Sequence, residues 1–190
     1  MKKSLLLSSL LLLSSLASAS PVMTERTTYY KISGSSANDL RNQMNALGPI
    51  DQNTRVDAKT TWYVSWNYNW RYDTPSQNPC YVTNVQVKGD ITYLFPEWIN
   101  ASQGDPGLQT KWNNYLKILT IHEQGHANNG KKTADEIEKA LLSVQPQVNC
   151  TVLENTLNAA AKKILAEHND WDLQYDAETD HGKKQGAIFP

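Results

Sequence analysis

Hydrophobic and polar positions alternate with a period of two in the first half of the chain. Residues 59–73 place polar side chains on one face and mainly aromatic ones on the other, which comprises Trp62, Val64, Trp66, Tyr68, Trp70 and Tyr72. Residues 81–93 alternate in the same way after a polar loop. This pattern predicts two half-buried strands, which we expect to pair antiparallel, with a β-bulge at Gly89. The aromatic face is either part of the core or an exposed stacking surface for glycans or peptides.

A shorter strand and a helix are predicted before this pair of strands. The sequence TTYYKIS at residues 27–33 is typical of a strand, and Ser36 or Asn38 can cap the helix that follows it. We expect Gly48-Pro49 to end that helix, because proline cannot continue it.

From Asp105 onward the hydrophobic period becomes that of a helix. One stripe steps alternately by four and three residues, through Leu108, Trp112, Tyr115, Leu119, His122 and His126. Gly130 is expected to end this helix. Thr133 with Glu136 is typical of a capping box, which predicts that a second helix starts there and runs to about Val144.

A third helix is predicted after Pro146. Its apolar stripe comprises Leu153, Leu157, Ala160, Ile164, His168 and Trp171. Residues 171–190 show no clear period and are rich in polar side chains. A first half made of strands and a second half made of helices predict an α+β fold, in which a small antiparallel sheet packs against the helices.

The N-terminus has the composition of a signal peptide. Lys2 and Lys3 precede an apolar stretch at residues 5–16, and small residues follow at 17–19. We expect cleavage after Ala19, so that residues 1–19 are removed and residues 20–190 form a single periplasmic or secreted domain. A membrane anchor is the alternative, although the stretch is short for a span and no later one is apolar enough.

The net charge bears on the choice of partner, and the cysteine count bears on covalent cross-linking. Loss of Lys2 and Lys3 takes the formal charge from −1 to −3, and the remaining basic residues form no stripe, so nucleic acid is a poor candidate. Cys80 and Cys150 are the two cysteines, and in an exported chain an even count predicts a disulfide. Two free buried thiols are the alternative.

The sequence HEQGH at residues 122–126 carries the main chemical signal. His122 and His126 are one helical turn apart, so their imidazoles project from one face and can bind one zinc ion. Glu123 can then reach a zinc-activated water as general base without ligating the metal. The pair continues the apolar stripe and uses two of the four histidines, which favours a zincin-like active helix. A buried neutral pair bonded to protein groups is the alternative.

A catalytic zinc site needs a third protein ligand. The metzincin pattern is excluded, because Asn129 and Lys132 occupy the positions where it requires glycine and histidine. Glu136 is possible, but capping explains it more simply. His168 on the third helix and His181 in the polar tail are equally good candidates from spacing alone.

HEQGH followed by YDAETDHGKKQGAIFP at residues 175–190 resembles the bacterial domain-of-unknown-function family 922. The resemblance covers nearly the whole mature chain, including residues 29–44, residues 57–68 and the two cysteines. It implies an exported zinc-dependent protease. Because His181 falls on the family motif and His168 does not, the resemblance also favours His181 as the third ligand.

Three other residues near these motifs have two interpretations each. The Tyr175 hydroxyl can donate to the oxyanion formed when a peptide carbonyl is attacked, or the ring can simply pack. Asp176 can orient a ligand histidine or, more simply, cap a turn. Gly125 inside a helix indicates close approach of the C-terminal segment or of a substrate, unless the helix merely tolerates it.

Together these observations predict an exported zinc peptidase. Zinc would be held by His122, His126 and His181, with Glu123 as general base and a peptide or protein as substrate. One alternative is a periplasmic adaptor in which zinc only stabilises the structure. The other is a cell-envelope protein that binds peptidoglycan through its aromatic face.

Overall fold

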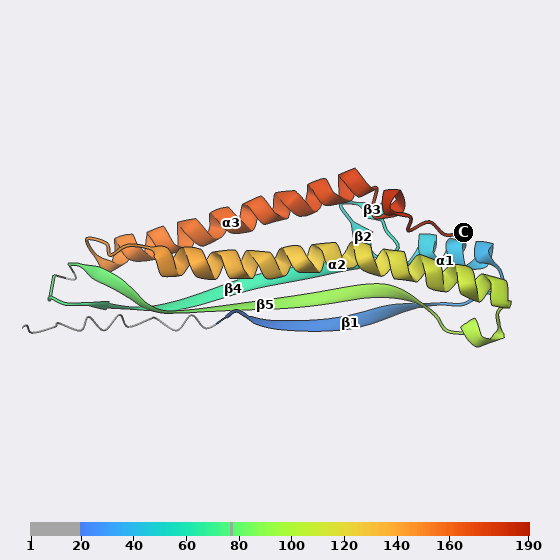
Figure 1. The fold of residues 1–190 in the computed structure, drawn as a ribbon, viewed down its shortest axis with the longest axis horizontal. Helices are drawn as coiled ribbons and strands as arrows, with labels where there is room; N and C mark the ends of the chain where they lie inside the picture. The colour runs from blue at the N-terminus through green and yellow to red at the C-terminus, as the bar shows by residue number, and fades with distance from the viewer. Residues whose placement is uncertain (1–19, 77) are drawn as a thin grey trace, which may run out of the picture.

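The computed structural model describes residues 20–76 and 78–190, which form a sheet with long helices stacked along one of its faces (Figure 1). The elements follow the order β1 (Val22–Ile32), α1 (Ala37–Leu47), β2 (Ile50–Asp51), β3 (Thr54–Arg55), β4 (Lys59–Tyr72), β5 (Cys80–Trp98), α2 (Pro106–Ser143) and α3 (Cys150–Thr179). The predicted α+β class is therefore confirmed. The predicted signal peptide lies outside the described residues, and none of the described helices is long and apolar enough to cross a membrane.

Strand β5 lies at the centre of the main sheet. It pairs antiparallel with β4, as predicted, but parallel with β1, so the prediction of an antiparallel sheet is wrong for β1 and the sheet is mixed. The predicted bulge at Gly89 is wrong, because Gly89 pairs regularly with Val64 and Met23, and the register shifts at Asn69 instead. The space beside Gly89 is filled by the end of the Met23 side chain, which would have to shift if residue 89 carried a Cβ.

The aromatic face of β4 is mostly core. Val64, Trp66 and Tyr68 pack on a cluster of buried apolar side chains from β5, α2 and α3. The Trp66 indole also donates to Asn158 Oδ1 of α3 at 3.0 Å. Trp70 lies further along the strand and is 41% exposed, so a stacking surface is restricted to the end of β4.

Helix α2 is a single helix of 38 residues, and the predicted break at Gly130 is wrong. At about 1.5 Å per residue it runs along most of the sheet, and the far ends of β4 and β5 extend beyond it (Figure 1). Gly130 instead gives room to the Trp62 ring, because a Cβ there would lie 2.7 Å from Trp62 Cγ. Thr133 caps nothing, since its hydroxyl donates to the Asn129 carbonyl one turn earlier, at 2.8 Å. Tertiary packing therefore overrides the local helix-stop signals.

Helix α3 runs antiparallel to α2 and continues to Thr179, beyond the predicted stripe. It ends where Asp180, His181 and Gly182 adopt positive φ angles. The remaining tail returns to the core, because Ala187 and Phe189 are buried beside Trp112 and Tyr115 of α2.

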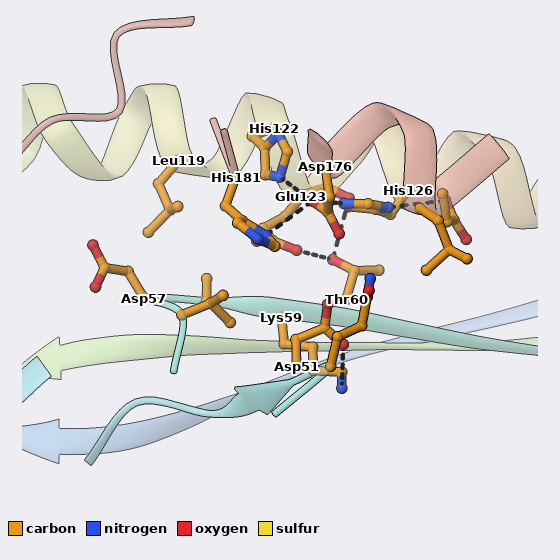
Figure 2. A pocket seen from close by; sticks show the side chains of 15 residues that line it. Asp51, Asp57, Lys59, Thr60, Leu119, His122, Glu123, His126, Asp176 and His181 are labelled. Carbon is orange, nitrogen blue, oxygen red and sulfur yellow. Dashed lines mark hydrogen bonds and ion pairs between the residues drawn. The ribbon is translucent and has the colours of Figure 1, made fainter. Parts of the chain in front are cut away.

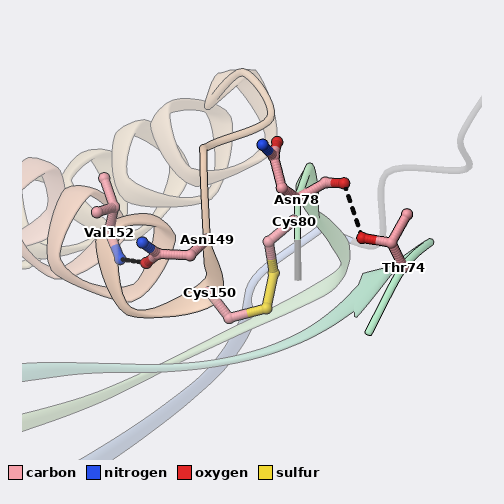
Figure 3. Close-up of a disulfide and its surroundings, with 6 residues drawn as sticks. All are labelled: Thr74, Asn78, Cys80, Asn149, Cys150 and Val152. Carbon is pink, nitrogen blue, oxygen red and sulfur yellow. Dashed lines mark hydrogen bonds between the residues drawn. A yellow bond between two sulfur atoms is a disulfide. The ribbon is translucent and has the colours of Figure 1, made fainter. Parts of the chain in front are cut away.

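The predicted disulfide joins Cys80 at the start of β5 to Cys150 at the start of α3 (Figure 3). Two apolar clusters fill the space between sheet and helices. The first contains residues of α2 from Leu108 to Leu119, and the second contains residues of α2 from Ala134 to Leu141. Between them α2 buries polar side chains, from His122 to Thr133. The candidate site lies in this polar interval.

Candidate metal centre

The centre of the site is a carboxylate of α3 facing two imidazoles of α2. Asp176 Oδ1 lies 3.1 Å from His122 Nε2 and 3.1 Å from His126 Nε2. Both histidines are buried, at 2% and 7% exposure. The i,i+4 spacing of the histidines meets the same spacing of Asp172 and Asp176 on the antiparallel helix, so the two pairs face each other.

The second nitrogen of each imidazole is also bonded. His122 Nδ1 lies 3.0 Å from Gln185 Oε1, and His126 Nδ1 lies 2.9 Å from Asp172 Oδ1. Each Nδ1 atom faces an oxygen acceptor, so an imidazole that donates there leaves its Nε2 atom, which faces Asp176, free to ligate a cation. Acceptors of this kind fix the orientation and raise the basicity of ligand histidines.

His126 and Asp176 favour each other's charged forms. Burial opposes a charge on His126, but hydrogen bonds with Asp172 and Asp176 raise its pKa to about 10. Burial alone would raise the pKa of Asp176, but hydrogen bonds with His122 and His126 hold that pKa well below its usual range. The proton of the His126 imidazolium thus neutralises the Asp176 carboxylate at the position where a metal cation could bind. Metal binding would release that proton.

The donor atoms fit a divalent metal ion. In the described part of the chain, two groups of three side chains offer ligand atoms within 4.8 Å of one another: His122, His126 and Asp176, and then Asp51, Asp176 and His181. Asp176 belongs to both groups. Two imidazole nitrogens and one carboxylate oxygen form a donor set that zinc accepts in catalytic sites.

Glu123 lies beside the pair without belonging to either group (Figure 2). Its side chain is buried, and its Oε2 atom accepts a hydrogen bond from Thr60 Oγ1 of β4 at 2.6 Å. Burial raises the Glu123 pKa, and the bond from Thr60 offsets part of that rise. Glu123 lines a cavity of about 150 Å³ that lies between α2, α3 and the β2–β3 hairpin.

His181 joins this cavity and His168 does not. His181 Nδ1 lies 3.3 Å from Asp176 Oδ1, the same oxygen that faces the α2 histidines. His168 and Glu136, the other candidate ligands, lie outside the cavity and bond to each other at 2.9 Å. The structure thus places both Asp176 and His181 next to the pair, with Asp176 nearer to it.

Comparison with known proteins agrees with the resemblance in the motifs. The family model described as "Bacterial protein of unknown function (DUF922)" matches residues 27–182. The chain belongs to this family. No curated protein and no solved structure matches it. The DUF922 match spans the HEQGH helix, Asp176 and His181, so every residue of the two potential ligand groups lies within it.

Tyr175, which the DUF922 match includes, packs on the site from outside the cavity. Its ring stacks on the His122 ring, with centroids 4.9 Å apart, and its hydroxyl lies 3.4 Å from the His122 carbonyl oxygen. The oxyanion role stays a prediction, and the structure places the ring as a packed aromatic. The prediction of a close approach at Gly125 is confirmed, because a Cβ there would lie 2.5 Å from the Tyr175 hydroxyl.

Several residues of the site had not been singled out from the sequence. Thr60, Asp51 and Lys59 reach the cavity from β4 and the β2–β3 hairpin, and no local motif marks them. Asp172 did have a signal, since it precedes Asp176 by one helical turn and so repeats the histidine spacing. Gln185, which bonds His122, lies beyond the DUF922 match.

Proposed function

We propose that this protein is an exported, periplasmic or secreted zinc-dependent peptidase. The observation that supports it is the convergence of His122 and His126 Nε2 on one point, with the Glu123 carboxylate beside them. Zinc would be held by this pair with Asp176, and His181 is the further ligand that the family motif suggests. Zinc held there would supply Lewis-acid activation of water and of a peptide carbonyl.

Glu123 is the general base and acid of the proposed reaction. Its Oε2 atom is held by Thr60, which leaves Oε1 to take a proton from the attacking water and pass it to the leaving amine. A raised pKa suits this role, because the carboxyl group must hold the proton between the two transfers. The zincin-like arrangement of the helix is part of this proposal.

A zinc clamp without catalysis is the second candidate. Gln185 contacts His122 and His181 contacts Asp176, so a metal here would also fasten the C-terminal segment onto α2. Peptidoglycan binding through the aromatic face has less support, because α3 covers most of that face.

Glu123→Gln separates the two candidates. The substitution removes the proton acceptor and keeps the side-chain shape, so we expect bound zinc to stay while hydrolysis of a peptide library falls by about 10²–10⁴-fold. Metal content and cleavage are measured on the same preparations, with the exposed Glu167→Gln of α3 as control. Equal cleavage by Glu123→Gln and wild type would refute the mechanism. Zinc content without cleavage by the wild type would favour the clamp.

A further inference from the structure

Asp172 of α3 is held in place by three donors from two other elements. Its Oδ1 atom accepts from His126 Nδ1 at 2.9 Å and from Asn129 Nδ2 at 3.1 Å, and its Oδ2 atom accepts from Trp62 Nε1 at 2.6 Å. These donors come from α2 and from β4. Such a carboxylate has little freedom to rotate, because each oxygen already faces at least one fixed donor.

The Asn129 amide is itself oriented by a second layer. Its Oδ1 atom lies 2.5 Å from His168 Nδ1, and its Nδ2 atom also donates to the His168 carbonyl at 2.9 Å. His168 Nε2 lies 2.9 Å from Glu136 Oε2, near the surface. Because Asn129 and His168 are 6% and 7% exposed, water competes little for these bonds. The Nδ2 end of the amide is thereby directed at Asp172.

We infer that Asp172 is a positioning residue for His126, and that Trp62 and the Asn129–His168–Glu136 chain hold Asp172 in the orientation that this requires. The inference rests on the proposed function, since it takes His126 as a metal ligand. Accepting from Nδ1 keeps the proton on that nitrogen and turns Nε2 toward Asp176. His168, which spacing alone makes a candidate ligand, acts instead from behind the site.

The inference also explains Gly130 and the first part of the aromatic strand. The Trp62 indole reaches Asp172 only by passing over α2 at Gly130, where a side chain would collide with its ring. The sheet therefore contributes to the orientation of a metal ligand, and Trp62 has a role beyond filling the core.

The chain offers a matched pair of substitutions. Trp62→Phe and Trp66→Phe each remove one indole N–H from the inward face of β4. The first loses the hydrogen bond to Asp172 of α3, and the second loses the hydrogen bond to Asn158 of α3. Only the first bond leads to His126. We expect Trp62→Phe to weaken zinc binding several-fold and Trp66→Phe to leave it unchanged. Asp172→Asn should weaken it by roughly 10–100-fold, because three donors would then share one acceptor oxygen.

Zinc affinity is measured by competition with a chelator on the folded apoprotein, and cobalt(II) absorption reports the ligand geometry. The thermal midpoints of the apo forms show whether each variant is folded. Weaker binding and a changed cobalt spectrum in Trp62→Phe and Asp172→Asn, but not in Trp66→Phe, support the inference. Wild-type affinity in both Trp62→Phe and Asp172→Asn overturns it and leaves the proposed function standing. A wild type that binds zinc tightly but cleaves nothing refutes only the peptidase, whereas one that binds no zinc refutes both.

Discussion

At the scale of single residues, the site depends on Asp176. One oxygen of this half-buried side chain lies within 3.3 Å of nitrogens from His122, His126 and His181. A charge in such a place is tolerated only when it is paired, and the imidazoles provide the pairing. The same arrangement fits the proposed role of Asp176 as a metal ligand better than the turn cap that its sequence position suggests.

Removing Asp176 or His181 tests which of them completes the ligand set. Asp176→Ala deletes the oxygen nearest to both histidines of α2, so we expect it to abolish stoichiometric zinc binding. His181→Ala should weaken binding less, because its nitrogen reaches the same oxygen from beside the group. Zinc content after dialysis is the measurement, with the exposed Glu178→Ala as control. Loss of zinc in His181→Ala alone would make His181 the third ligand and Asp176 a supporting residue.

At the scale of elements, the close approach of α2 and α3 sets the geometry of the site. The helices run antiparallel, so a turn of α2 bearing two histidines meets a turn of α3 bearing two aspartates. Gly125 permits this approach, because Tyr175 occupies the space where its side chain would be. The stacking of Tyr175 on Trp171 and His122 then holds the end of α3 against α2.

Gly125→Ala should therefore destabilise the protein, although alanine is the better helix former by about 1 kcal/mol. The new methyl group would meet the Tyr175 ring, and overpacking of this kind typically costs about 1–3 kcal/mol. The free energy of unfolding in urea measures the effect. In a Tyr175→Leu background the collision is relieved, so the same substitution should be neutral or stabilising. A stabilising Gly125→Ala in the wild-type background would contradict the packing.

At the scale of the whole molecule, the disulfide and the site lie near opposite ends of α3. Cys150 is the first residue of the helix and Asp176 lies 26 residues later, which corresponds to about 39 Å along the axis. One apolar cluster surrounds the disulfide, and the other holds the C-terminal tail near the site. We therefore expect stability and the proposed metal binding to depend on separate parts of the molecule.

Replacing both Cys80 and Cys150 by alanine should lower stability and spare the metal site. The bond closes a loop with a sequence separation of 70 residues, and its loss should cost about 4 kcal/mol through the greater freedom of the unfolded chain. Thermal unfolding measures the loss. Zinc affinity of the folded variant, measured well below its midpoint, should equal that of the wild type. A large fall in that affinity would show that the two ends are coupled.

The part of the candidate site that lies on the HEQGH turn of α2 was predictable from the sequence. The HEQGH pair faces inward as its stripe indicated, and Glu123 lies beside it. Asp172 and Thr60 were not predicted, because each acts on a residue far away in the chain. The structure brings His181 to the cavity, where the motif placed it, but puts Asp176 closer to the pair.

Local patterns alone determined the two long strands β4 and β5 with their antiparallel pairing, the α+β class, the disulfide and the direction in which the HEQGH histidines face. These features follow from the side-chain periodicity of strands and helices, or from the tendency of paired cysteines to form a disulfide in an exported chain. Both can be recognised in the residues of the segments themselves. Only the tertiary structure decided that α2 passes unbroken through Gly130, that His168 lies behind the site and that Asp176 is at its centre. In each case a side chain from another element arrives there, such as Trp62 at Gly130, and long-range packing outweighs the weaker local preference.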